Sequence, residues 1–189
     1  VGLATAYTLC EKREILVLDK NPSFGQETSS RNSEVIHGGI YYPPESLKAE
    51  LCIEGRQMLY ALCENHNIPH KKLGKLLVAQ EKKESDKLEK IFDNAKKCGI
   101  DNLRFIDGDE LKRMEPCVRS AKTLLIPDTG ILDSHAAMKF LYDYSRTRNV
   151  DFVFSTAVTG IKKTSAGYKI TVKEYNGETF DFLSDRVVN

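Results

Sequence analysis

The stretch that decides the fold is Val1–Lys20, VGLATAYTLCEKREILVLDK. Residues 1–12 are rich in helix-forming residues and have a small, apolar face, whereas residues 14–19 (EILVLD) form a short apolar run that ends on a carboxylate. Short apolar runs of this kind are typical of strands buried in a parallel sheet. A helix followed by such a strand predicts an α/β fold.

Gly2 and Asp19 fit the dinucleotide-binding fingerprint of such a fold. In G-x-G-x-x-G the glycines let a pyrophosphate approach a helix N-terminus, and a carboxylate roughly 20 residues after the first glycine binds a ribose hydroxyl. Gly2 matches only the third glycine, so we expect the chain to begin inside this helix, with the first two glycines upstream. A plain helix–strand packing unit explains the two residues about as well.

A more specific segment lies in the long loop expected over residues 21–42. Residues 28–42 are TSSRNSEVIHGGIYY. Hydroxyls, backbone amides and the Arg31 guanidinium together suit a phosphate, and Gly38 and Gly39 allow the backbone to approach a flat ring closely. The alternative is a polar surface loop with a capping serine. It is less favoured because the segment directly follows the expected ribose-binding strand.

The rest of the chain shows first helical and then alternating periodicity. We expect helices over residues 45–65, 84–98, 107–115 and 134–148. We expect strands over residues 75–80, 123–126, 151–154, 157–163, 168–174 and 179–183, and the start of another at 186–188. Asn176-Gly177 is the strongest hairpin signal in the chain.

Composition excludes several classes of protein. The 189 residues are 41% hydrophobic, enough for one good core or two small ones. The net charge of +1 gives no footprint for nucleic acid, and no apolar run is long enough for a membrane span. The five cysteines form no C-x-x-C pair, and Pro69 interrupts any helix between His66 and His70. We therefore expect reduced thiols and no metal site.

Several stretches together resemble the L-2-hydroxyglutarate dehydrogenase family, within the D-amino-acid oxidase-like superfamily of FAD proteins. They cover nearly the whole chain: GQETSSRNS (25–33), the segment 28–42, SLKAELCIEG (46–55), IPHKKLGKLLVA (68–79) and PDTGILDSH (127–135). The resemblance implies FAD as cofactor and oxidation of L-2-hydroxyglutarate to 2-oxoglutarate by hydride transfer to flavin N5. It also implies that a membrane quinone or another acceptor takes the electrons.

The same resemblance carries expectations about location and site residues. It implies a mitochondrial location in a eukaryote, or otherwise a cytoplasmic one or one peripheral to the inner membrane through regions outside this chain. The cofactor contacts that it implies are Gly2 and Asp19 in the fingerprint, Lys20 near the adenosine, Ser29, Ser30 and Arg31 facing the pyrophosphate, His37, Gly38 and Gly39 near the flavin ring, and Val158 at the adenine. For Val158 a place in the core is an equally good interpretation.

Catalysis needs a base, and the substrate needs cations. Removing the hydroxyl proton while hydride leaves suits imidazole, which exchanges protons near neutral pH, so His37 is the expected base or flavin contact. The alternative is a structural histidine that hydrogen-bonds the loop. Arg31 and Lys75 are candidate partners for a dicarboxylate 2-hydroxyacid, although Lys75 also fits a solvated lysine at a strand edge.

The resemblance implies a two-part architecture. We expect an incomplete Rossmann-like FAD-binding domain from residues 1–70 and 133–189, which includes a β-meander, and an inserted mixed α+β substrate domain over residues 71–132. We expect the enzyme to continue beyond Asn189, so that residues 1–189 alone bind FAD poorly and are inactive. Two alternatives stay open: another flavin oxidoreductase, for glycerol 3-phosphate, amines or amino acids, and a non-catalytic nucleotide-binding paralogue.

Overall fold

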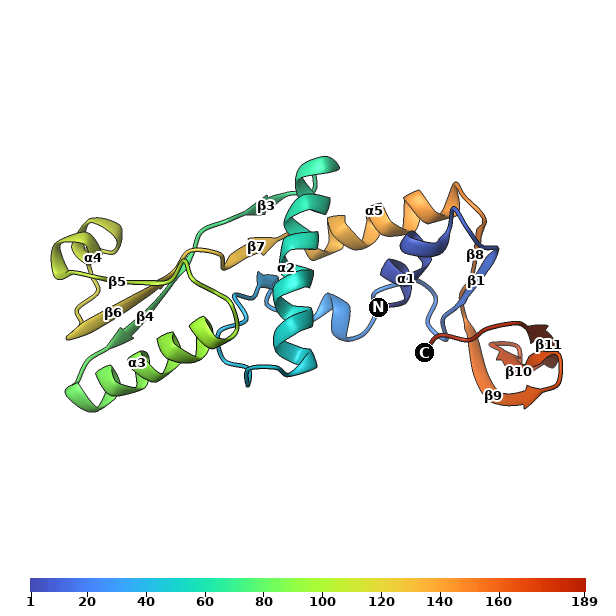
Figure 1. Ribbon diagram of the computed structural model, residues 1–189. Coiled ribbons are helices and arrows are strands. Elements are labelled where there is room, and N and C mark those ends of the chain that lie inside the picture. The colour runs from blue at the N-terminus through green and yellow to red at the C-terminus, as the bar shows by residue number, and fades with distance from the viewer. The chain divides into compact units, whose positions relative to one another are not determined.

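The computed structural model describes residues 1–189, which fold into two compact units (Figure 1). The terminal unit comprises Val1–Asn32 and Ser134–Asn189, and the central unit comprises Ser33–Asp133. Contacts thus place residues 33–70 with the central unit. Which segments serve the cofactor and which the substrate is a separate question and stays a prediction. Every helix is too short or too polar to cross a membrane.

The terminal unit begins with the expected helix and strand. Its first elements are α1 (Gly2–Leu9), β1 (Ile15–Leu18), the 3-10 turn η1 (Thr28–Ser30), α5 (Ser134–Arg146) and β8 (Val150–Val153). β1 pairs with β8 in parallel, which confirms the expected parallel strand. The small side chains of Ala6 and Cys10 are fully buried and let α1 pack closely on this sheet.

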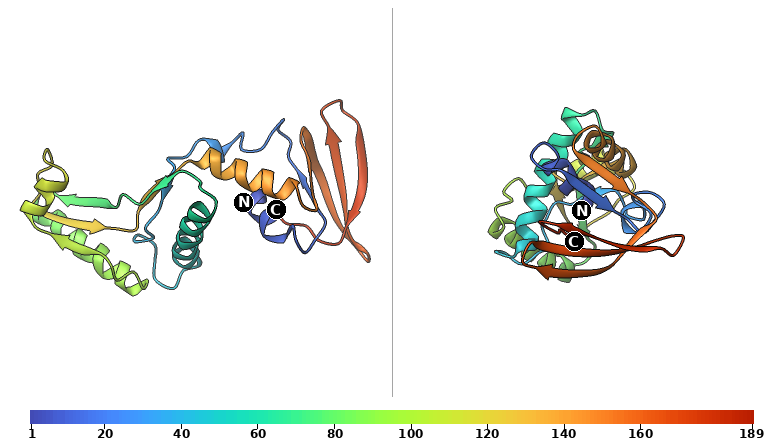
Figure 2. Two further views of the ribbon diagram at one scale, coloured as in Figure 1. Left: turned by 90° about the horizontal axis from the view of Figure 1, so that it is seen from above. Right: turned by 90° about the vertical axis from the view of Figure 1, so that its right-hand side faces the viewer.

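A three-stranded antiparallel meander completes the terminal unit. It consists of β9 (Thr156–Thr164), β10 (Gly167–Glu174) and β11 (Thr179–Ser184), with β10 in the middle (Figure 2). The expected hairpin is present: Gly177 has a φ of +91° in the β10–β11 turn, which favours glycine. The strand expected at residues 186–188 is absent, because no neighbouring strand pairs with this segment.

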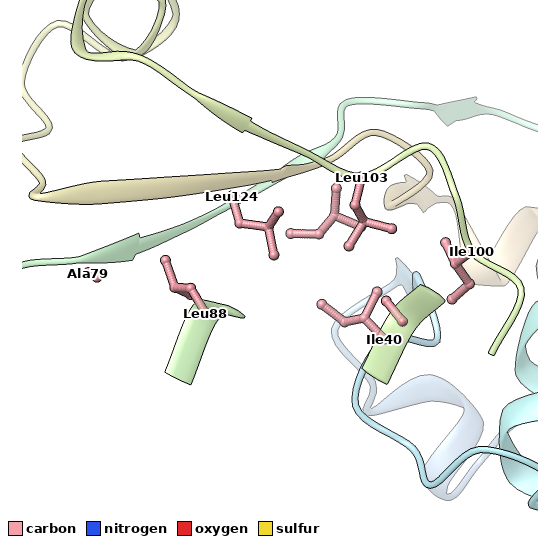
Figure 3. Close-up of a cluster of buried hydrophobic side chains, with 8 residues drawn as sticks. Ile40, Ala79, Leu88, Ile100, Leu103 and Leu124 are labelled. Carbon is pink, nitrogen blue, oxygen red and sulfur yellow. The ribbon is translucent and has the colours of Figure 1, made fainter. Parts of the chain in front are cut away.

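The core of the central unit lies between a sheet and a helix. The antiparallel sheet has the order β4 (Lys75–Ala79), β6 (Lys122–Ile126), β5 (Arg104–Ile106), and α3 (Lys82–Lys97) packs on it. The buried side chains, several of them labelled in Figure 3, are Ile40, Ala79, Leu88, Ala95, Ile100, Leu103, Leu124 and Ile126. A capping box between Glu81 and Glu84 starts α3. The short helix α4 (Gly108–Met114) lies within the range expected for a helix, residues 107–115, and its N-cap Asp107 accepts from the Glu110 N–H.

A second, smaller sheet in the central unit was not expected. It has the order β2 (Val35–Ile36), β7 (Gly130–Leu132), β3 (His70–Lys71), all antiparallel. Strands of two or three residues are too short to show a period in the sequence. They matter because β2 leads directly into the His-Gly-Gly segment.

Helix α2 (Leu47–Asn65) buries a different face from the one its leucines suggest. Leu47, Leu51 and Met58 are 67%, 55% and 62% exposed in this chain. Ala49, Arg56 and Cys63 are the buried residues of α2. The helix therefore turns its smaller residues and one arginine inward.

Candidate functional site

Asp19 follows β1 directly, at the carboxyl end of a parallel strand. Its backbone donates to Val153 O (3.1 Å) and accepts from the Thr156 N–H (3.0 Å). One carboxylate oxygen accepts from the Asn21 N–H (2.9 Å), and the other has no partner in the chain. The carboxylate lines a polar cavity of about 180 Å³, completed by Lys20, Asn21, Gly25, Gln26, Glu27, Thr28 and Ser29. In open α/β sheets, ligands bind outside the carboxyl ends of the strands.

Lys20 lines the same cavity as one half of an ion pair. Its ammonium is 2.8 Å from a Glu27 carboxylate oxygen. The hydrogen bond and the charge of Glu27 raise the pKa of Lys20, and the hydrogen bonds from Lys20 and Asn21 lower the pKa of Glu27. Both groups are exposed, so solvent screens the pair. An anionic ligand in the cavity would therefore meet a lysine whose charge is already partly balanced.

The serines and the arginine of the motif lie in and after η1. Ser29 lines the cavity with Asp19. The Ser30 hydroxyl donates to Glu27 O (3.0 Å), which stabilises the turn. Arg31 is exposed and forms no ion pair, so its guanidinium is available to an anion.

Two expected cofactor residues of the terminal unit lie outside this cavity. Gly2 is exposed at the start of α1, and a Cβ there would meet nothing within 4 Å. The close packing within the chain that motivated Gly2 is made instead by Ala6. Val158 is 44% exposed on β9, opposite Val172, so it is not a core residue of this chain.

In the central unit, an exposed histidine is followed in the chain by two buried glycines. His37 is exposed, and its imidazole forms no hydrogen bond within the chain. Gly38 is buried, and a Cβ on it would lie 3.0 Å from Ile126 Cγ2. Gly39 has a φ of +83°, a conformation that favours glycine. The alternative of a histidine that hydrogen-bonds its own loop thus finds no support in the structure.

A buried ion pair supports the glycine segment. Arg56 is 7% exposed; its Nη1 donates to Gly38 O (2.9 Å), and its Nη2 lies 3.4 Å from Asp128 Oδ2. Asp128 also accepts from Lys72 Nζ (2.6 Å) and Asn102 Nδ2 (2.7 Å). Burial works to raise the pKa of the Asp128 carboxyl, but these hydrogen bonds and the charges of Arg56 and Lys72 outweigh it and lower the pKa.

Two hydroxyls flank the ion pair. The Tyr60 hydroxyl donates to Asp128 O (3.1 Å), and burial, followed by the Asp128 charge, raises the pKa of Tyr60. Thr129 Oγ1 is fully buried and has no hydrogen-bond partner. It lies 3.1 Å from the position that a Cβ on Gly38 would occupy. Arg56, Asp128 and Thr129 were not expected as site residues. Asp128 and Thr129 belong to the stretch PDTGILDSH, and Arg56 lies in the helix expected over residues 45–65.

Lys75, the other candidate cation, lies over an aromatic ring. Its ammonium is 4.8 Å from the centroid of the Tyr41 ring and 3.4 Å from the Tyr41 hydroxyl. It forms no ion pair. A partly buried lysine without a carboxylate partner suits an anionic ligand, and a solvated lysine remains the alternative.

The family of this chain is evident from one match that runs its whole length. The family model described as FAD dependent oxidoreductase (DAO) matches residues 1–189. The match includes the cavity residues of the terminal unit and the His-Gly-Gly segment of the central unit.

Curated relatives share one name. The chain is 50% identical over 146 residues to "L-2-hydroxyglutarate dehydrogenase, mitochondrial" of Arabidopsis thaliana. This match covers 77% of this chain and 30% of the relative. It is 39% identical to the protein of the same name from Nematostella vectensis (92% of this chain, 39% of the relative) and 34% identical to that of Homo sapiens (94% and 41%). The matches thus span about 30% to 41% of the length of these relatives.

Solved structures share the fold. An L-alpha-glycerophosphate oxidase from Mycoplasma pneumoniae, solved with FAD bound, superposes with a TM-score of 0.82 at 28% identity, over 90% of this chain and 46% of that one. A glycine oxidase from Geobacillus kaustophilus superposes with a TM-score of 0.81 at 19% identity, over 98% of this chain and 50% of that one, which speaks for the fold alone. With the family match over all its residues, the chain belongs to the FAD dependent oxidoreductase (DAO) family.

Proposed function

We propose that the protein containing this chain oxidises L-2-hydroxyglutarate to 2-oxoglutarate with FAD as cofactor. The name of the curated relatives supports the substrate, since it recurs at 34–50% identity. The observation that carries the chemistry is the His37 imidazole, which is exposed, without a hydrogen bond in the chain, and next to buried, fixed glycines. Because neither ring nitrogen is engaged within the chain, the imidazole is accessible to a substrate proton.

The terminal unit fits the nucleotide portion of FAD. The unpartnered carboxylate oxygen of Asp19 suits a ribose hydroxyl as acceptor, at the edge of a parallel sheet where nucleotides bind. Ser29 and Arg31 offer a hydroxyl and a guanidinium for the pyrophosphate, whereas the hydroxyl of Ser30 is already engaged and contributes through the turn. Lys20, Gly2 and Val158 remain proposed contacts on the strength of the family resemblance.

The central unit fits the reacting portion. Gly38 packs against Ile126 and Gly39 against Ile53, with no room for a side chain at either position. Gly39 also holds a backbone conformation that favours glycine, so the backbone next to His37 is fixed. When bound, the flavin supplies the acceptor for hydride from the alcohol carbon. His37 takes the hydroxyl proton, and Lys75 is the proposed partner of a substrate carboxylate, whereas Arg31 is assigned to the pyrophosphate. Residues 1–70 and 133–189 form the proposed FAD-binding domain, and residues 71–132 the proposed substrate domain.

Location and electron acceptor follow the relatives as proposals. The curated relatives are named as mitochondrial proteins, so we infer the same location if the source is a eukaryote. A quinone or another acceptor then reoxidises the flavin.

The test uses the full-length protein. We expect it to purify with a flavin absorption spectrum that L-2-hydroxyglutarate bleaches under anaerobic conditions, while glycerol 3-phosphate, glycine and the D-enantiomer do not. Bleaching by glycerol 3-phosphate alone would instead favour the second candidate function, suggested by the glycerophosphate oxidase with 28% identity. A bound flavin that no substrate reduces would point to a non-catalytic paralogue.

The base is tested separately. We expect His37→Ala to lower the rate of flavin reduction about 100-fold or more, because general-base catalysis contributes about 10²–10⁴-fold. His66→Ala, at another exposed histidine of the central unit, is the control and should leave the rate unchanged. An unchanged rate in His37→Ala would remove His37 as the base.

A further inference from the structure

Arg56 is a buried charged residue, and the stability of the protein alone does not explain why a charge is buried at this position. Its side chain is 7% exposed, and that of Asp128, its partner, is 15% exposed. A buried ion pair is weak evidence for stability, because the cost of removing two charges from water often exceeds their attraction. Asp128 is moreover already satisfied by Lys72 and Asn102. The contact that only Arg56 makes is the one with Gly38.

That contact fixes one particular peptide group. Arg56 Nη1 donates to Gly38 O at 2.9 Å, and this carbonyl belongs to the same planar peptide as the Gly39 N–H. In a trans peptide the two groups point in opposite directions, and the chain contains no cis peptide bond. With the carbonyl held by Arg56, the N–H therefore points away from Arg56. It has no hydrogen-bond acceptor within the chain, although Gly39 is buried.

A second polar group in the same place also lacks a partner. Thr129 Oγ1 is fully buried, without a hydrogen bond, and close to Gly38. Buried donors without partners are rare, and because Thr129 Oγ1 is sealed inside the chain, only the Gly39 N–H is a candidate donor to a bound ligand.

We propose that Arg56 is a positioning residue for this site: it holds the Gly38–Gly39 peptide so that the Gly39 N–H donates a hydrogen bond to the bound flavin. The inference rests on the function proposed above, which brings a flavin to His37-Gly38-Gly39. Asp128 holds Arg56 in turn. A hydrogen bond from a charged donor to the carbonyl also polarises the peptide, which makes the N–H on its other side a better donor.

The test compares substitutions of two ion-paired arginines of the central unit in the full-length protein. Arg56→Met removes the buried guanidinium, and Arg56→Lys keeps the charge but loses the fork that reaches Gly38 and Asp128 together. Arg104→Met is the matched control, because Arg104 is exposed and pairs with the Glu110 side chain alone. Leu111→Ala, in a separate part of the core, controls for a loss of stability without a change at Gly38.

We expect Arg56→Met to lower the rate of flavin reduction at saturating substrate about 10–100-fold, the usual effect of a misplaced group. It should also shift the flavin absorption maximum and reduction potential, and Arg56→Lys should recover part of each change. Arg104→Met and Leu111→Ala should keep the wild-type spectrum and potential, even if Leu111→Ala lowers the Tm. If Arg56→Met folds poorly, Arg56→Lys and Asp128→Asn supply the same measurements.

A direct readout does not depend on turnover. Labelling with 1-¹³C-glycine and ¹⁵N-glycine detects Gly-Gly peptides selectively, and Gly38-Gly39 is the one such peptide in these 189 residues. We expect FAD to shift its amide resonance in the wild type and not in Arg56→Met. If the wild type binds FAD and is reduced by L-2-hydroxyglutarate, but Arg56→Met changes only the Tm, Arg56 is merely structural and the inference fails. If the wild type binds no flavin at all, the proposed function is refuted, and the inference that rests on it falls with it.

Discussion

Gly130 lies where the small sheet of the central unit leaves no room for a side chain. It belongs to β7, opposite Ile36 of β2, in the sheet that leads into His37-Gly38-Gly39. A Cβ on Gly130 would lie 2.5 Å from Lys71 O, a backbone atom of β3, and closer still to the Tyr60 hydroxyl. A Cβ atom essentially never lies within 3.0 Å of another non-bonded heavy atom, so Gly130→Ala must move β3 away from β7 and displace Tyr60.

The expected cost follows from these two displacements. Overpacking a filled site costs about 1–3 kcal/mol, and losing the hydrogen bond from Tyr60 to Asp128 O adds about 0.5–1.5 kcal/mol. We expect Gly130→Ala to lower the free energy of unfolding by about 2–4 kcal/mol. Gly55→Ala is the control within the same unit. It lies inside α2 with nothing within 4 Å of its Cβ, so the substitution should stabilise by about 0.5–1 kcal/mol.

The assay is urea unfolding of the full-length protein, followed by circular dichroism at one fixed FAD concentration, because a ligand shifts apparent stability. Gly130→Ala should unfold at lower urea than the wild type, and Gly55→Ala at the same or higher urea. A Gly130→Ala variant within about 0.5 kcal/mol of the wild type, the range of ordinary surface substitutions, would refute the described pairing of β7 with β3.

Three further predictions concern buried groups of the central unit. Thr129→Val removes a buried hydroxyl without a partner, so it should leave the Tm of the FAD-free protein unchanged or raise it; a clear loss would reveal an unseen partner. Leu124→Ala empties a fully buried site in the core of Figure 3 and should cost about 2–5 kcal/mol in urea unfolding, whereas a cost below 1 kcal/mol would contradict that core. The folded-state pKa of Asp128 is lowered, so its stabilising contribution is complete above its unfolded pKa of about 4 and is lost as pH falls through the folded value. Asp128→Asn should therefore flatten the decline of stability below about pH 4, and an unchanged acid limb in unfolding titrations would exclude this role.

Much of the fold could be predicted because several elements carry strong local signals. The apolar spacing of α3 and the Asn176-Gly177 turn of the meander are properties of neighbouring residues. The apolar run that ends on Asp19 predicted β1 as a strand of a parallel sheet, but it did not identify β8 as its partner. The strands β2, β3 and β7 were invisible, since each has two or three residues and exists only through partners distant in the sequence.

The candidate site also contains residues that the sequence predicted and residues that it did not. Asp19 and Ser29 were named from a motif, and the structure places both on one cavity, because only a short loop separates them. The ion pair of Arg56 with Asp128 could not be found by spacing, because the two lie far apart in the sequence and meet only through tertiary packing. Gly2 is the opposite case. Its expected role in the dinucleotide fingerprint depends on close packing, but a Cβ on Gly2 would meet nothing within 4 Å in residues 1–189.

The sequence nevertheless contains a signal for the burial of Arg56, in the residues that share its face of helix α2. Ala49, Arg56 and Cys63 are seven residues apart, nearly two turns of a helix, so they share one face of α2. A face of small residues around an arginine competes with the face of Leu47 and Leu51, and apolar size alone favours the leucines. The outcome depends on whether the guanidinium finds acceptors once it is buried, because a buried charge without a partner is costly. Gly38 O and Asp128 provide them, and both lie outside the helix. The orientation of α2 is therefore decided by the segment that follows His37, which ties the packing of the helix to the geometry of the site.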